Sequence, residues 1–145
     1  MTMIIEMNSG MRHTTEYSDT LTREQRQRAM ELMASQFCEL LGRSPRENLY
    51  WQESVTDLMD LSHEVYLSER LVDSHGRPYG FRRIVELACQ VLHVVTPCNP
   101  YSMAFNARNR KGVRQTSFFS RYCWLMFKSH TPNPLRQMVK RMNEG

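Results

Sequence analysis

The chain has 145 residues, of which 41% are hydrophobic and 23% are charged, and its formal net charge is +4. This apolar share supports a hydrophobic core, which excludes an intrinsically disordered chain, and the length suits one domain with extensions. We therefore expect a flexible N-terminal segment at 1–20, a single helical domain at 21–130, and a basic C-terminal helix or tail at 131–145.

Hydrophobic spacing predicts helices along most of the chain and almost no strands, so the expected fold class is all-α. The first helix follows a T-R-E-Q capping box headed by Thr22 and ends at Gly42. The second starts at Ser54. The third, fourth and fifth are expected at 81–95, about 100–111 and 117–127, with Thr116 or Ser117 as the cap of the fifth, and a short basic helix is expected at 135–142.

The fourth predicted helix has two different sides. It begins at Asn99 and Pro100, a cap and a first-turn proline, and Gly112 can end it. One side is apolar and holds Tyr101, Met103, Ala104, Phe105 and Ala107. The other side is polar, lacks carboxylates, and holds Ser102, Asn106, Asn109 and Arg110. Asparagine pairs with adenine, arginine with guanine and serine with either, so the polar side is a candidate base-reading surface. A solvated helix face is the alternative.

Positive charge is concentrated near the C-terminus. From residue 105 onward the chain carries nine Lys or Arg residues and one acid, Glu144. This asymmetry points to a polyanionic partner. The short turn TPCNP joins the third and fourth helices, which suggests a helix-turn-helix bound to double-stranded DNA. Lys111, Arg114 and Arg121 are then the expected phosphate contacts.

Residues 51–126 resemble the C-terminal domain of the RteC family of conjugative-transposon regulators. The resemblance rests on W-x-x-S-V-T-D-L-M-D-L (51–61), V-Y-L (65–67), the region of Gly76, and N-x-R-N-R-K-G-V-R (106–114) followed by T-S-F-F. It implies a winged-helix-like DNA-binding domain in a regulator or accessory protein of a mobile genetic element. No wing is predicted, because residues 112–117 offer only a turn.

Catalytic patterns are weak. Asp57, Asp60, His63 and Glu64 share part of one helix surface, where a D-x-x-H step could bind a divalent metal. An exposed acidic face explains the same pattern, and nothing completes a metal site. The sequence has no G-x-S-x-G motif, P-loop or dinucleotide fingerprint. We therefore expect no enzyme activity, no metal and no cofactor.

A protein–protein interaction module or a homodimer is the alternative to DNA binding. Trp124 and Phe127 point away from the predicted core side of the fifth helix, and Met30 and Met33 make the first helix adaptable. The four cysteines are widely spaced and three lie in apolar patterns, which is typical of buried thiols in a reduced cytoplasmic protein. No segment suits a signal peptide or a membrane span.

Overall fold

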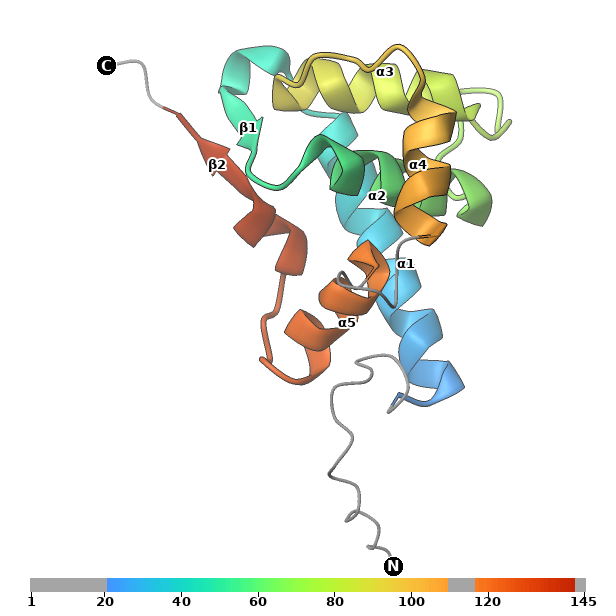
Figure 1. The fold of residues 1–145 in the computed structure, drawn as a ribbon, viewed down its shortest axis with the longest axis vertical. Helices are drawn as coiled ribbons and strands as arrows, with labels where there is room; N and C mark the ends of the chain where they lie inside the picture. Colours follow the sequence, from blue (N-terminus) through green and yellow to red (C-terminus); the bar gives the residue numbers. More distant parts are fainter. Residues whose placement is uncertain (1–20, 110–116, 143–145) are drawn as a thin grey trace, which may run out of the picture.

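The computed structural model describes residues 21–109 and 117–142. These residues form mainly α-helices with one two-stranded sheet (Figure 1). In chain order the elements are α1 Arg23–Leu41, the 3₁₀-helix η5 Pro45–Glu47, β1 Leu49–Trp51, α2 Val55–Ser68, α3 Phe81–Leu92, α4 Pro100–Asn109, α5 Phe118–Phe127, the 3₁₀-helix η6 Pro134–Met138 and β2 Val139–Arg141. The predicted, mainly helical character is confirmed, but the prediction lacks the sheet.

Three predicted helix starts are confirmed by the atoms that cap them. At α1 the Gln25 N–H donates to Thr22 Oγ1 and the Thr22 N–H donates to Gln25 Oε1, both at 3.0 Å. Ser54 and Ser117 cap α2 and α5 by accepting the N–H of the residue three positions later, at 3.0 and 3.2 Å. Each cap satisfies an amide that the first helical turn leaves unpaired.

The hydrophobic core lies where α1, α2, α3 and α5 meet. α1 contacts each of the other three helices, and α2 contacts both α3 and α5. The largest fully buried side chains include Met33, Phe37, Leu58, Leu61, Ile84, Leu92, Phe118 and Tyr122. The Tyr122 hydroxyl donates to Gln36 Oε1 at 2.8 Å, which satisfies it inside the core. Burial raises the pKa of Tyr122 well above its usual value, so the phenol stays neutral.

The C-terminal segment differs from the predicted basic helix. Residues 134–138 form η6, and residues 139–141 form β2, which pairs antiparallel with β1 in the register Leu49↔Arg141 and Trp51↔Val139. Leu135 and Met138, three residues apart, are both buried, and this spacing places them on one side of a 3₁₀ turn. The described part of the predicted tail therefore packs on the helical core.

The third helix is shorter than predicted. α3 ends at Leu92 because His93 adopts a left-handed conformation (φ 59°, ψ 47°). His93 is held there by a 2.8 Å hydrogen bond between its Nδ1 and the Leu49 carbonyl, and by stacking on Tyr50. Val95, which the predicted helix at 81–95 would have included, is 89% exposed. The connection to α4 therefore covers residues 93–99.

The acidic face predicted on α2 is also partly wrong. Asp60 is only 3% exposed, and its Oδ2 accepts the Phe118 N–H at 3.2 Å. A buried carboxylate is stable there because the first turn of α5 presents unpaired amides and the positive end of the helix dipole.

Two further predictions concern the burial of the cysteines and the absence of a membrane span. All four cysteines are free; Cys89 and Cys123 are buried, Cys38 is half-buried and Cys98 is exposed. Burial raises the pKa of Cys123 to about 12. Within the described ranges, no helix combines the length and the apolar character needed to cross a membrane.

Candidate nucleic-acid interface

The candidate interface is built on α4. This helix packs mainly on α2 and not on α3, the helix that precedes it in the chain (Figure 1). Pro100 occupies the first position of α4, as predicted, and it is buried. The Asn99 carbonyl accepts the Met103 N–H at 3.2 Å. Ala104 is 1% exposed, while Met103 and Ala107 are half-buried. Because these residues form a narrow contact, most of the remaining surface of α4 faces outward.

The outward surface of α4 consists of two adjacent rows of side chains. Ser102 and Asn106 form one row, four residues apart, and both are exposed as predicted. Tyr101 and Phe105 form the other row and are 51% and 64% exposed. The prediction placed these two rings on the apolar side, which we expected to face the core, but the buried contact runs along Met103, Ala104 and Ala107 and leaves both rings more than half exposed. We call these four residues the α4 face.

An aromatic cluster fixes the start of α4. The Tyr101 ring lies 4.5 Å from the Phe81 ring, centroid to centroid, and the Phe81 ring lies 5.3 Å from that of His63 on α2. Phe81 is 1% exposed and begins α3. The cluster therefore ties the starts of α3 and α4 to α2. Partial desolvation, and then the nearby Tyr66 hydroxyl, raise the pKa of Tyr101.

One basic residue of α3 lies near the start of α4. α4 contains no Asp or Glu. Arg82 and Arg83 are exposed directly after Phe81, and Arg82 is close enough to the Tyr101 hydroxyl to act on it electrostatically. Arg83 lies 3.8 Å from Glu86, whereas no carboxylate in the described ranges forms an ion pair with Arg82. Arg82 is therefore a basic residue near α4 that the sequence analysis does not select, because it precedes the C-terminal charge cluster.

Four of the other predicted contact residues have side chains outside the described part of the chain. Asn109 is the last residue of α4, but its side chain lies outside the described part of the chain. Arg110, Lys111 and Arg114 fall within residues 110–116, which also lie outside it, as does the predicted helix end near Gly112.

Arg121, the remaining predicted phosphate contact, has partners within the fold. Its guanidinium nitrogens lie 2.5 Å from Asp57 Oδ1 and 3.5 Å from Glu53 Oε1. Its Cζ also lies 5.6 Å from the centroid of the Phe118 ring. These contacts join α5 to the start of α2, and a phosphate would have to compete with two carboxylates for the same group.

The arrangement of α3 and α4 does not confirm the predicted helix-turn-helix. A turn of about three or four residues is typical of such modules. Residues 93–99 make a longer connection here. The two strands of the sheet come from distant parts of the sequence and form no hairpin after α4, so they do not form the wing that the RteC resemblance implies.

The acidic residues of α2 offer no metal centre in the described ranges, where no group of three or more His, Cys, Asp or Glu side chains could hold an ion.

Comparisons with protein-family models, curated proteins and solved structures find no match. The similarity to RteC therefore rests on the sequence motifs alone.

Proposed function

We propose that the protein binds double-stranded DNA through the α4 face. The observation that carries the proposal is the exposed set Ser102, Phe105 and Asn106 on a helix without carboxylates. The sequence continues from this helix directly into Arg110 and Lys111. Serine and asparagine can hydrogen-bond to base edges, and phenylalanine can contact the methyl group of thymine.

The dimensions of α4 suit the major groove. An α-helix with its side chains is about 10–12 Å in diameter, which matches the groove width of about 12 Å, and ten residues make it ~15 Å long. Ser102 and Asn106 are separated by ~6 Å along the helix axis, close to the rise of two base pairs. They can therefore reach neighbouring steps of one site, with Asn109 and Arg110 expected further along.

Basic residues at both ends of α4 supply the phosphate contacts in this proposal. Arg82 lies at the start of the helix, and Lys111 and Arg114 follow its end in the sequence. Arg121 is left out, because Asp57 and Glu53 already engage its guanidinium. The resemblance to RteC extends the proposal to a regulator or accessory protein of a mobile genetic element.

Two classes of substitution test the assignment. The double variant Asn106→Ala with Arg110→Ala should weaken binding to a site selected from random duplexes by about 1–3 kcal/mol per lost base contact, with little change on unrelated sequences. Lys111→Ala and Arg114→Ala should weaken binding to all sequences alike. Arg28→Ala, which removes an exposed charge on α1, is the matched control. If all the variants bind DNA as the wild type does, the assignment is wrong.

The alternative function is protein interaction through α5. Trp124 is 40% exposed and lines an open hollow of about 350 Å³ with Leu125 and Met138. Met33, which the sequence suggested for such a surface, is fully buried and cannot contribute to it. Measurement of the mass in solution separates the alternatives: a dimer that dissociates on Trp124→Ala would favour interaction, and a monomer would remove the case for a homodimer.

A further inference from the structure

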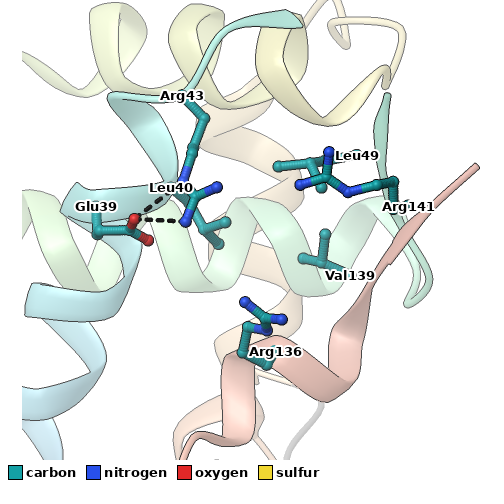
Figure 2. A pocket seen from close by; sticks show the side chains of 7 residues that line it. All are labelled: Glu39, Leu40, Arg43, Leu49, Arg136, Val139 and Arg141. Carbon is teal, nitrogen blue, oxygen red and sulfur yellow. Dashed lines mark hydrogen bonds and ion pairs between the residues drawn. The ribbon is translucent and has the colours of Figure 1, made fainter. Parts of the chain in front are cut away.

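A hollow lined by arginines lies where the end of α1 meets the sheet. It has a volume of about 130 Å³, enough for a ligand of a few heavy atoms (Figure 2). Its walls come from α1 and the residues that follow it, from β1, and from η6 and β2. The site therefore forms only when the C-terminal strand pairs with β1. We call it the arginine hollow.

Three guanidinium groups surround the arginine hollow. Figure 2 shows Arg43, Arg136 and Arg141 approaching it from three sides, with Leu49 and Val139 between them. Arg43 follows α1, Arg136 lies in η6 and Arg141 ends β2. Guanidinium groups so arranged present N–H donors that can share one anion.

The three arginines differ in how far carboxylates already satisfy them. Arg43 is held by Glu39 at 2.8 Å and by Glu47 at 2.9 Å. Arg141 has one longer contact, 3.4 Å from its Nη2 to Glu47 Oε1, and its side chain is 53% exposed. Arg136 is exposed and forms no ion pair with any residue that the structure describes. Arg136 and most of Arg141 are thus free to bind a ligand.

Charge and polarity together define the ligand. Three arginines and their two glutamates leave the arginine hollow with one net positive charge, which one negative charge would balance. Leu40 and Leu49, each almost buried, and half-buried Val139 form an apolar floor. A ligand that matches both has one anionic group and a short apolar body.

We propose that the arginine hollow binds a small monocarboxylate with a short aliphatic chain. The carboxylate accepts hydrogen bonds from Arg136 and Arg141 in the planar geometry that guanidinium groups favour, and the chain rests on Leu49 and Val139. Arg43 stays paired with Glu39 and Glu47 and adds to the local positive potential. This site is independent of the proposed DNA binding.

Titration of the full chain with butyrate tests the proposal directly. Calorimetry at constant ionic strength should give saturable binding, and backbone amide shifts in NMR spectra should be largest near β1 and β2. Butyramide has nearly the same shape without the charge, and acetate keeps the charge without the aliphatic chain. Both should bind more weakly than butyrate.

Charge-neutralising variants give shifts of opposite sign. Arg136→Gln should weaken butyrate binding roughly tenfold, as expected for the loss of one charge-assisted hydrogen bond. Glu47→Gln should strengthen it, because Arg43 and Arg141 then lose a competing carboxylate. Arg28→Gln and Glu24→Gln make the same charge changes at exposed positions on α1 and should leave the affinity unchanged.

Three results would overturn the proposal. The first is the absence of saturable binding to butyrate. The second is equal binding of butyramide, which would mean that the arginines play no part. The third is tighter binding of inorganic phosphate than of butyrate, which would assign the arginine hollow to a phosphate group and leave the apolar floor without a role.

Discussion

At the residue scale, the Asp60 carboxylate is one of the contacts that hold α5 against α2. Asp60→Ala removes the acceptor of the Phe118 N–H in a site that is 3% exposed. A buried donor without its partner costs about 1–3 kcal/mol, so the free energy of unfolding should fall by that amount in urea titrations. Asp60→Asn keeps a carbonyl oxygen and should lose less. A loss no larger than that of the exposed control Glu86→Ala would contradict this role.

The exposed thiol and the two buried thiols should react at different rates. Cys98 is exposed on the connection between α3 and α4, whereas Cys89 and Cys123 are buried. Burial also raises the pKa of the Cys123 thiol to about 12, which leaves almost no thiolate at pH 8. We expect a disulfide reagent to modify Cys98 quickly in the folded protein, and Cys89 and Cys123 only after unfolding in denaturant. Fast modification of Cys123 in the native state would be inconsistent with the described core.

Single residues also show where sequence reasoning fails. The helical wheel predicts the exposure of Ser102 and Asn106, because polarity and position agree there. It fails for Phe105, since a wheel cannot show that the contact with α2 is narrow and leaves this ring exposed. It also fails for Asp60, whose partner is the start of a helix far along the chain. Both errors concern tertiary contacts.

At the element scale, the features that local rules determine are predicted well. The caps at Thr22 and Ser54 depend on neighbouring residues only, and both are confirmed; of the two caps that the sequence allows for the fifth helix, the structure has Ser117. β1 and β2 have three residues each and are far apart in the sequence, so no local pattern predicts that they pair. The end of α3 depends on the bond from His93 to β1 and is missed for the same reason.

Leu135 tests whether the C-terminal segment belongs to the core. Its side chain is 1% exposed in η6, next to β2. Leu135→Ala should lower the free energy of unfolding by about 2–5 kcal/mol, the cost of a core cavity, with an unchanged denaturant slope. Gln137→Ala, an exposed neighbour, is the control and should change it by about 0.5 kcal/mol or less. Equal effects of the two substitutions would mean that the segment does not belong to the core.

At the scale of the whole molecule, the charge distribution read from the sequence is partly neutralised by folding. Arg121 pairs with Glu53 and Asp57, and Arg141 contacts Glu47. The basic excess after residue 105 is therefore smaller at the surface than the nine Lys and Arg residues suggest. The proposed phosphate contacts, Arg82, Lys111 and Arg114, are correspondingly few, which predicts moderate salt dependence.

The most direct test of DNA binding is a fluorescence-anisotropy titration of the protein with random-sequence duplex DNA at several salt concentrations. Three phosphate contacts predict binding at low salt, with a slope of log Kobs against log salt of roughly −3, about 0.9 for each contact. Arg82→Ala should reduce that slope by about one, and Arg28→Ala should leave it unchanged. The absence of binding at low salt, or binding that salt does not weaken, would contradict the proposal that the α4 face meets DNA.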